Sequence, residues 1–318
     1  MNFSCTSQQT NTISEKVQIT LLSKIAMPEV RGRIDHISYD PVKHLAFVAA
    51  LGNNTVEVVN LDAGLTVRTI TGLREPQGIA YIPSLSKIVV ANGADGKCIF
   101  YNTSAFGQTG FVDLKDDADN TRYDSGSHLL YVGYGKGGIA GIDVNSMKQV
   151  ANIPLDGHPE SFQISPQKKR IYVNVPDADE IEVADLTTNK INVKWKNRNV
   201  SANYPMALDE KNNRLFIGYR SPATLRMINA ESGNEISSIK CTGDADDVFC
   251  NDSLVFVSGG KGFIDVFRIN NDGLNQINHI ATKKGARTSL LLAVEKRLLL
   301  AVPASNSEPA SLWVYSVN

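Results

Sequence analysis

The 318-residue sequence contains no run of about 18 apolar residues, the length that a membrane-spanning helix requires. It also lacks an excess of charge of one sign, because 32 Lys and Arg residues stand against 33 Asp and Glu residues. Proteins held mainly by nucleic-acid phosphates usually carry a basic excess or a basic stripe. The charge balance therefore argues against a nucleic-acid binder, although it leaves room for a local basic patch.

Cysteines and the motifs of covalent catalysis are also scarce. The chain has four cysteines, with no C-x-x-C pair and no histidine at zinc-finger spacing. Neither a zinc site nor a disulfide framework is therefore indicated. Cys241 and Cys250 are candidates for pairing in an oxidising compartment, which their spacing alone does not decide. No serine occupies a G-x-S-x-G motif, so nucleophilic catalysis has no support in the sequence.

Residues 1–16 differ in composition from the rest of the chain. They are rich in Ser, Thr, Asn and Gln and nearly free of apolar residues, which predicts a disordered polar leader. Ser4-Cys5 followed by polar residues resembles the site at which bacterial lipoproteins are cleaved and lipidated on cysteine. Two interpretations stay open here: a lipid anchor at Cys5, and an ordinary terminus with a chance cysteine.

The strongest pattern in the sequence is a short segment that recurs seven times. In each copy a turn-like lead-in precedes a polar residue and an apolar run. The third residue of each copy marks its position, and successive markers are 40 to 46 residues apart: His36, Gln77, Asn120, Glu160, Met206, Asp247 and Thr288. A second marker follows each of them by 21 to 28 residues: Asn60, Asn102, Asp143, Asp185, Asn229, Arg268 and Ser316. Two markers that stay in phase seven times indicate a structural repeat.

Each repeat has the pattern of four short strands separated by turn residues. In the first repeat the expected strands are Ile37 to Tyr39, Leu45 to Ala50, Thr55 to Asn60 and Leu65 to Ile70. Four strands in a unit of about 40 residues form the blade of a β-propeller. The sequence therefore predicts an all-β protein in which residues 17–318 form a seven-bladed β-propeller with four-stranded antiparallel blades.

The two ends of the repeat region predict how the ring closes. The last repeat ends with Trp313 to Val317, which leaves it without a fourth strand. The strand-like segment Val17 to Ile25 precedes the first repeat and has no other place in it. We expect this N-terminal strand to pair with the last blade, because the pairing completes the seventh blade and protects its open edge.

Several segments also resemble bacterial YVTN-repeat, YncE-like β-propellers. The resemblance runs from about Gly32 to the C-terminus and rests on Gly32 to His36, Ala50 to Val58, Glu75 to Gly78, Gly157 to Phe162, Gly243 to Asp247 and Gly285 to Ser289. It implies an exported, often periplasmic, seven-bladed propeller, and it implies no particular reaction. The chain departs from the generic repeat by placing a different polar residue in each blade, as expected of an asymmetric binding site.

In a propeller, the connections between blades and the turns between the second and third strands gather on one face, around the central channel. The seven first markers are therefore expected to form a ring at the mouth of this funnel. Side chains expected just above the ring are Arg33, Asp35, Arg74, Asp116, Asp117, Asp119, His158, Asp244, Asp246 and Arg287. The turns add Asn53, Asn92, Asp95, Tyr134, Asp177, Arg220 and Lys261. No metal motif is present, and His36, Glu160 and Asp247 are the groups able to hold a hard cation or to act as general acid and base.

The same polar residues have simpler explanations. A water-filled channel is lined by polar groups whether or not a ligand binds, and Asp or Asn before a strand forms turns through nearby N–H groups. Gly133 to Gly138 fits G-x-G-x-x-G, but a strand is expected after it and the dinucleotide motif requires a helix. Asp116 to Asp119 and Asp244 to Asp247 lack the spacing of an EF-hand. We expect them to be solvated turns, with a cation at the funnel as the alternative.

Three functions remain for this sequence. The leading hypothesis is a non-catalytic, exported binding scaffold, periplasmic or held at the cell envelope as a lipoprotein, that holds a small polar ligand, a peptide or a protein partner at the funnel without a cofactor. The alternative is a metal-assisted lyase or lactone hydrolase that uses the same residues, a divalent cation and at least one strongly shifted pKa. The third is a nucleic-acid binder, which the balanced charge disfavours. A closed ring has no obligatory interface, so we expect a monomer.

Overall fold

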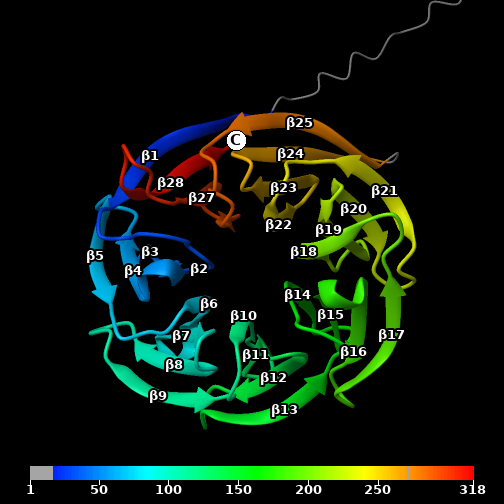
Figure 1. Cartoon of the computed structure of the whole chain (residues 1–318), viewed down its shortest axis with the longest axis horizontal. Helices are drawn as coiled ribbons and strands as arrows, with labels where there is room; N and C mark the ends of the chain where they lie inside the picture. The colour runs from blue at the N-terminus through cyan, green and yellow to red at the C-terminus, as the bar shows by residue number, and fades with distance from the viewer. Residues whose placement is uncertain (1–16, 271–272) are drawn as a thin grey trace, which may run out of the picture.

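The computed structural model describes residues 17–270 and 273–318. These residues form 28 strands in seven four-stranded antiparallel sheets, arranged as blades around a central axis (Figure 1). The predicted seven-bladed β-propeller is therefore confirmed. The described residues include no helix that is long and apolar enough to cross a bilayer. The leader and Cys5 lie outside the described residues.

Blades 1 to 6 each consist of four consecutive strands. Blade 1 contains β2 (Ile37–Asp40), β3 (Leu45–Ala50), β4 (Thr55–Asn60) and β5 (Leu65–Ile70). Blade 2 contains β6 (Pro76–Ile82), β7 (Lys87–Asn92), β8 (Lys97–Asn102) and β9 (Gln108–Asp113). Blade 3 contains β10 (Ala118–Asp124), β11 (Leu129–Tyr134), β12 (Gly138–Asp143) and β13 (Lys148–Pro154). Blade 4 contains β14 (Phe162–Ser165), β15 (Arg170–Val175), β16 (Glu180–Asp185) and β17 (Lys190–Lys196).

Blade 5 contains β18 (Ser201–Asp209), β19 (Arg214–Ser221), β20 (Ala223–Asn229) and β21 (Glu235–Lys240). Blade 6 contains β22 (Ala245–Asn251), β23 (Leu254–Gly259), β24 (Phe263–Asn270) and β25 (Gly273–Ala281). Blade 7 contains β26 (Ser289–Leu292), β27 (Arg297–Val302), β28 (Ala310–Val317) and β1 (Ile19–Met27). Three short 3₁₀ helices complete the described secondary structure: η1 (Leu51–Asn53), η2 (Pro83–Leu85) and η3 (Pro176–Ala178).

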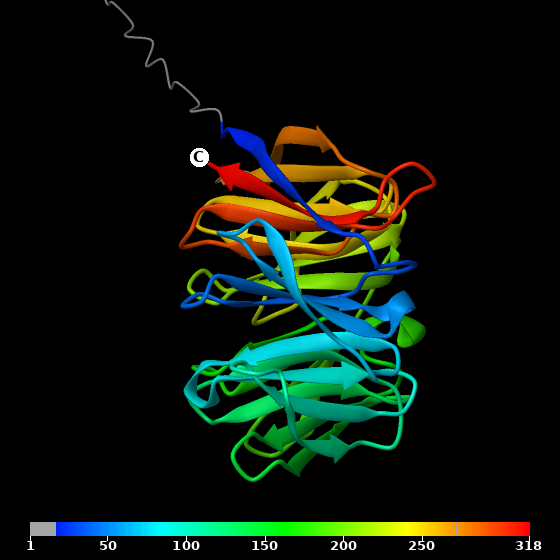
Figure 2. The same ribbon diagram turned by 90° about the vertical axis from the view of Figure 1, so that its left-hand side faces the viewer.

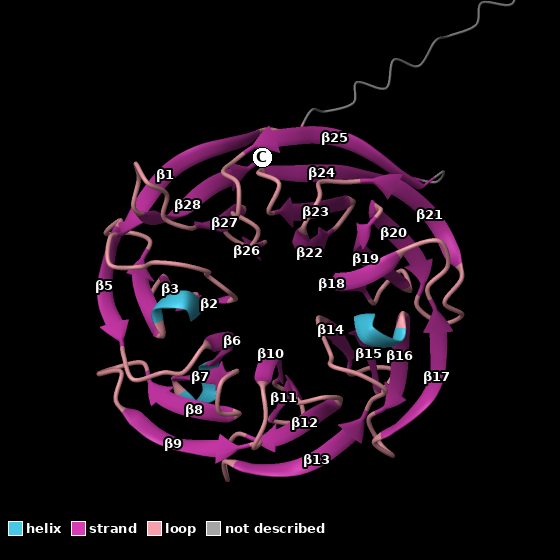
Figure 3. Ribbon diagram, viewed as in Figure 1, coloured by secondary structure: helices cyan, strands magenta, loops and turns pink. Residues whose placement is uncertain are grey.

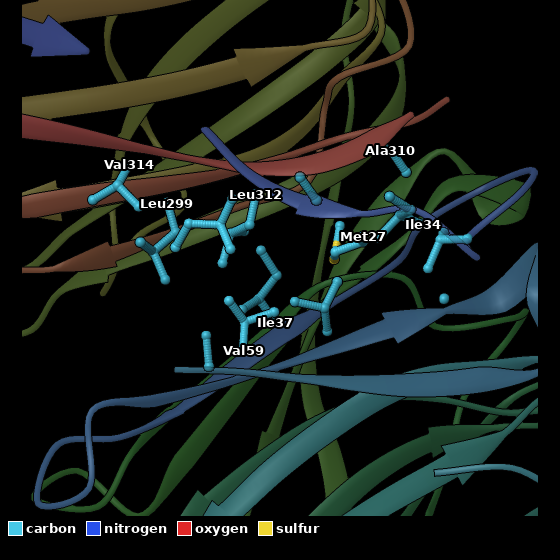
Figure 4. Packing of buried hydrophobic residues seen from close by; sticks show 14 of the residues in the cluster. Met27, Ile34, Ile37, Val59, Leu299, Ala310, Leu312 and Val314 are labelled. Atoms are coloured by element: carbon cyan, nitrogen blue, oxygen red, sulfur yellow. The ribbon is translucent and has the colours of Figure 1, made fainter. Parts of the chain in front are cut away.

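The N-terminal strand closes the ring as expected. β1 pairs antiparallel with β28 and is the outermost strand of blade 7, with Ile25 opposite Leu312 and Met27 opposite Ala310 (Figure 2). The strand begins and ends two residues later than its predicted bounds. Ile25 and Met27 point into an apolar cluster that also holds residues of blades 7 and 1, including Ile37 and Leu299 (Figure 4). Burial of this apolar face therefore joins the two ends of the chain.

Apolar packing between blades supplies the hydrophobic core. The described residues contain seven buried clusters, and each cluster joins side chains from two adjacent blades. Phe216 of blade 5 and Phe267 of blade 6, for example, lie in one cluster, and both are fully buried. Cys241 and Cys250 contribute to the same cluster as free thiols.

The second sequence marker has a local explanation in the turn after the third strand. The Asn60 side-chain oxygen accepts hydrogen bonds from the backbone N–H groups of Asp62 and Ala63. Asp185 and Asn229 accept the same pair of bonds in blades 4 and 5. Asn and Asp favour turns because they offer this local bond. The marker thus reports turn geometry.

Candidate functional site

The first strand of each blade lies nearest the axis (Figure 3). Its register with the second strand is the same in every blade, as seven pairs show: Ile37 with Val48, Ile79 with Val90, Thr121 with Val132, Phe162 with Val173, Met206 with Ile217, Val248 with Val257 and Ser289 with Leu300. At each first strand, the residue that precedes the paired one occupies the equivalent inner position. These residues are His36, Gly78, Asn120, Ser161, Pro205, Asp247 and Thr288.

Three of the sequence markers are one residue away from this position. Gln77 and Glu160 precede it and Met206 follows it. A shift of one residue turns a side chain of a strand to the opposite face. Met206 is accordingly 1% exposed and packs in an apolar cluster with Tyr172 and Ile217. The expectation that Met206 belongs to the polar ring is therefore corrected, and Pro205 takes that position.

Below this ring the inner strands surround a cavity of about 410 Å³. We call it the channel cavity. One further residue from each first strand lines it: Ser38, Ala80, Arg122, Gln163, Ala207, Phe249 and Leu290. His36, Ser161 and Asp247 of the ring bound its inner end. The sequence placed the site above the ring, at the face that carries the connections between blades, whereas the larger free space extends from the ring along the inner strands.

Above the ring, charged side chains fill the axis. We use the name axial cluster for these side chains together with three residues of the ring and Arg122. Its members are Arg33, Asp35, His36, Asp117, Asp119, Asn120, Arg122, His158, Glu160, Arg220, Asp244, Asp246, Asp247 and Arg287. A space of only about 20 Å³ remains between Arg33, Asp35, Glu160 and Asp246. In this cluster seven carboxyl groups face four arginines and two histidines. Acidic groups therefore outnumber the permanent cations.

The arginines of the axial cluster are held by its carboxylates. Arg220 contacts Asp246 at 2.5 Å through Nη2, and its guanidinium lies 3.7 Å from the centre of the Tyr204 ring. Arg287 contacts Asp244 at 3.0 Å and Asp246 at 3.2 Å. Arg33 contacts Asp35 at 2.9 Å. Ion pairs in such a partly buried place fix the positions of both partners.

A second chain of contacts crosses the channel. His36 Nε2 and Asn120 Nδ2 are 3.0 Å apart, and the Arg122 guanidinium donates to Asn120 Oδ1 at 2.5 Å. Arg122 also donates to the Thr121 carbonyl at 2.8 Å and lies 3.5 Å from Ser161 Oγ. Arg122 thus presents a positive charge at the inner end of the channel cavity. Burial lowers its pKa, against the attraction of Asp247 and Asp119.

Four carboxyl groups of the axial cluster have raised pKa values. Burial raises the pKa of Asp247 to about 7, although His36 opposes the shift. Burial raises the pKa of Glu160 to about 7, and repulsion from Asp119 adds to it. Burial also raises the pKa of Asp35 to about 6. Burial raises the pKa of Asp117 as well. The cause is common to all four, because a low-dielectric site disfavours the charged form of an acid.

The two histidines respond to the surrounding carboxylates. Interaction with Asp119, whose Oδ2 lies 3.6 Å from Nε2, raises the pKa of His158 to about 9. Its other ring nitrogen lies 2.6 Å from the Gly135 carbonyl oxygen. Burial lowers the pKa of His36, but Asp35 and Asp247 more than offset this, so that the pKa is raised overall. The neighbouring carboxylates therefore raise the pKa of both rings.

Glu160 differs from the other acids of the cluster. Among the described residues, no hydrogen bond or ion pair reaches its carboxyl group. The charges of Asp119 and Asp246 raise its pKa, and those of His158 and Arg220 lower it. Its carboxyl group borders the 20 Å³ space. A carboxylate in this position is stabilised by a proton or by a donor group from a ligand.

Three further predicted residues differ in their exposure and contacts. Gln77 donates to Asp117 at 3.0 Å, and Thr288 is buried and donates to the Ile34 carbonyl at 3.2 Å. Arg74 is exposed, and its backbone N–H donates to Asn92. Arg122 and Tyr204 were not predicted from the sequence. Arg122 had a detectable signal, because it follows the inner position by two residues and the equivalent residues of the other blades are uncharged.

The metal candidates are not brought together. Among the described residues, one group of three acidic or ligating side chains lies within coordinating reach, and it consists of Asp156, Glu180 and Glu182. His36, Glu160 and Asp247 do not form such a group.

Comparisons with known proteins support the fold. A chain in a crystal structure of a mitotic checkpoint complex is 14% identical, with a TM-score of 0.80 over 98% of this chain and 97% of that chain. A chain of Kuenenia stuttgartiensis hydrazine synthase is 12% identical, with a TM-score of 0.77 over 89% of this chain and 96% of that chain. At such identity the likeness shows the fold alone. No family model and no curated protein matches the chain, so the resemblance to YVTN-repeat, YncE-like propellers stays a prediction.

Proposed function

We propose that this protein is a non-catalytic binding propeller that holds a small molecule, or the terminus of a peptide, in the channel cavity. The observation that carries the proposal is a cavity of about 410 Å³ whose inner end is formed by His36, Arg122 and Asp247. Ligand sites in proteins are typically concave, about 300–1,000 Å³ in volume, and combine an apolar wall with a few convergent polar groups. Residues with perturbed pKa values at such a place are a further sign of a site.

The lining suggests the chemistry of the ligand. Arg122 and His36 supply donors, and Asp247 accepts while ionised and donates once protonated. Phe249, Leu290 and Leu208 supply an apolar wall farther along the cavity. A suitable ligand has a head group that accepts and donates hydrogen bonds and a short apolar body, as a free amino acid or a peptide terminus has.

A thermal-shift screen tests this proposal, with the natural amino acids and a panel of aromatic carboxylic acids as probes. Hits are then titrated by calorimetry. Arg122→Met removes the central donor, and Leu290→Trp fills the cavity without changing charge. Arg74→Met is the matched control, because it removes an exposed arginine outside the cavity. Binding by wild type and Arg74→Met, with loss in the two cavity variants, is the expected result. Binding that survives both cavity variants, or no binding by any probe, contradicts the proposal.

One observation favours a second function in the axial cluster. Asp247 and Glu160 have pKa values of about 7, which suits a general acid or base at neutral pH. A lyase or lactone hydrolase is therefore the alternative. Hydrolysis of a lactone panel, with and without added divalent ions, distinguishes it from binding alone. Turnover that falls in Glu160→Gln or Asp247→Asn supports the enzyme, and binding without turnover supports the scaffold.

A further inference from the structure

A second group of acids lies in the outer half of blade 4, away from the axial cluster. Glu180 and Glu182 stand on β16, two residues apart and therefore on the same face of the strand. Asp156 approaches them from the connection between β13 and β14. One potential ligand atom from each of the three side chains lies within 4.8 Å of the others.

The glutamates of this group are unusual in their burial. Glu180 and Glu182 are both 0% exposed, whereas the Asp156 side chain is 59% exposed. Glu182 Oε1 accepts the Asp156 backbone N–H at 3.0 Å. Glu182 Oε2 is buried and, within the described part of the chain, has no hydrogen-bond partner. The Glu180 carboxyl lies beside Glu182, and two buried carboxylates side by side are costly unless a shared proton or a cation lies between them.

Two lysines of β17 balance part of the charge. The register places Lys194 opposite Glu182 and Lys196 opposite Glu180. Lys196 Nζ lies 2.8 Å from Glu180 Oε2. Lys194 Nζ contacts Asp156, and it lies 3.7 Å from Glu180 Oε1 and 3.5 Å from Glu182 Oε1. Three carboxylates thus share two ammonium groups, and Lys194 is in reach of all three.

We propose that Asp156, Glu180 and Glu182 form a binding site for a hard divalent cation of the calcium class, and that the Lys194 ammonium holds this place when the ion is absent. The ammonium contacts all three carboxylates, which is where an ion would lie. Its long side chain is 35% exposed and can swing out to solvent. The exposed Asp156 leaves the ion a path inward. This site is independent of the channel cavity.

Equivalent acids in other blades show why this group differs. Glu57 of blade 1 pairs with Val48 and Asp265 of blade 6 with Val257, at the register position that Glu182 has with Val173. Both Glu57 carboxylate oxygens accept hydroxyl donors, from Thr55 at 2.7 Å and Thr69 at 2.6 Å. An acid at this register position can therefore have a donor for each carboxylate oxygen. In Glu182 only Oε1 accepts a hydrogen bond from such a donor.

The donor set favours calcium over magnesium. Ca²⁺ takes six to eight oxygen ligands at about 2.3–2.6 Å and tolerates irregular geometry. Carboxylates that bind through one or both oxygens supply part of this number, and water at the Asp156 side supplies the rest. Mg²⁺ requires near-octahedral geometry and gives up its water reluctantly, which a buried pair of glutamates on one strand does not suit.

Calorimetric titration of the metal-free full chain with CaCl2 and with MgCl2 tests the site. We expect one Ca²⁺ per chain, bound more tightly than Mg²⁺. Asp156→Asn and Glu182→Gln are each expected to weaken Ca²⁺ binding by about tenfold or more. Lys194→Met is expected to tighten it by about tenfold, because the competing ammonium is removed. Asp156→Asn changes an exposed side chain and keeps the test usable if Glu182→Gln fails to fold.

Two controls locate the ion. Glu57→Gln changes the equivalent acid of blade 1, and Glu160→Gln removes a carboxylate of the axial cluster; neither is expected to alter Ca²⁺ binding. Equal loss in either control would place the ion elsewhere and overturn the proposal. It is also overturned if neither wild type nor Lys194→Met binds Ca²⁺, or if Asp156→Asn and Glu182→Gln bind it as wild type does.

Discussion

Asp265 inside blade 6 and Glu160 at the axis of the ring have different surroundings, although both carboxyl groups are at least partly shielded from bulk water. Asp265 in blade 6 is 1% exposed and accepts the Thr242 backbone N–H at 2.6 Å and the Gln276 amide at 2.8 Å. His279 Nδ1 lies 2.5 Å from the same carboxylate. At the axis, Glu160 has no such donor among the described residues, and the neighbouring Asp119 and Asp246 raise its pKa further.

This difference separates structural acids from functional ones. A buried carboxylate with all its donors in place contributes to stability, because its desolvation is offset by charged hydrogen bonds. A carboxylate without donors costs stability in the free protein, and that cost is relieved only by a proton or a ligand. Among the acids of the axial cluster, Glu160 is therefore the one that binding, rather than folding, explains.

The largest effect is expected from Asp265→Asn. The new side chain keeps one acceptor oxygen for the Thr242 N–H, but its NH2 group replaces the oxygen that lies beside the Gln276 amide and His279 Nδ1, and the negative charge is lost. We expect the variant to lose about 2–3 kcal/mol of unfolding free energy, since hydrogen bonds to a buried charged acceptor are lost or weakened. Urea denaturation at pH 7 measures this loss. A variant as stable as wild type would show that the blade acids are not structural.

Glu160→Gln is expected to have the opposite sign. The pKa of Glu160 is about 7 in the folded protein, against an ordinary value of 4.5. Between these values the folded state holds a proton that the unfolded chain has lost, so wild type loses stability as pH rises through that window. The variant lacks this loss and should be more stable at pH 8 by roughly 1–2 kcal/mol, discounted for partial exposure. At pH 4 the two proteins should be equally stable.

Denaturation curves at pH 4 and pH 8 check this prediction. Glu57→Gln serves as the matched control, because Glu57 is a buried acid with its donors in place. A Glu160→Gln variant that is less stable than wild type at pH 8 would mean that the carboxylate has a stabilising partner. The comparison between axis and blades would then lose its basis.

A smaller effect is expected from His158→Gln. The pKa of His158 is about 9 in the folded protein, against an ordinary value of 6.5. A raised pKa of this kind stabilises the fold fully below pH 6.5, and the contribution disappears as pH rises through 9. The variant should lose about 1 kcal/mol at pH 6 and less at pH 10. The amide keeps a donor for the Gly135 carbonyl, so a loss independent of pH would contradict the assignment to charge.

The fold was predictable from the sequence to a greater extent than the site. Turn-forming residues such as Asn60 and the short apolar runs recur in phase, and both are local properties that a single sequence displays. The strands Leu45–Ala50, Thr55–Asn60 and Leu65–Ile70 have the predicted bounds. The ring position was less secure in three blades, because an irregular lead-in such as Tyr204-Pro205-Met206 hides the register. In blade 5 an error of one residue put Met206, which lies in the core, at the ring position that Pro205 occupies.

The pairing of charges could not be predicted at all. Nothing in the sequence separates Glu160, which lacks a partner among the described residues, from Asp246, which contacts Arg220 and Arg287. That distinction depends on which blades face each other across the axis. Arg122 was overlooked for a related reason, since it stands inside an apparent strand and outside the lead-in that marks each repeat. Arg122 is the single charged residue among the seven that follow the inner position by two residues.

The smallest effect is expected from Glu57→Gln, and it tests whether the kind of donor matters more than burial. Glu57 is 2% exposed, yet both its donors are threonine hydroxyls, from Thr55 and Thr69. A hydroxyl can turn and accept, so the new NH2 group finds a partner here without rearrangement, whereas in Asp265→Asn it replaces a charged oxygen beside the Gln276 amide and His279. We expect a change in unfolding free energy below about 0.5 kcal/mol, measured by urea denaturation beside Asp265→Asn. If the two variants lose equal stability, burial alone sets the cost, and the unpaired oxygen of Glu182 ceases to be a sign of a missing ion.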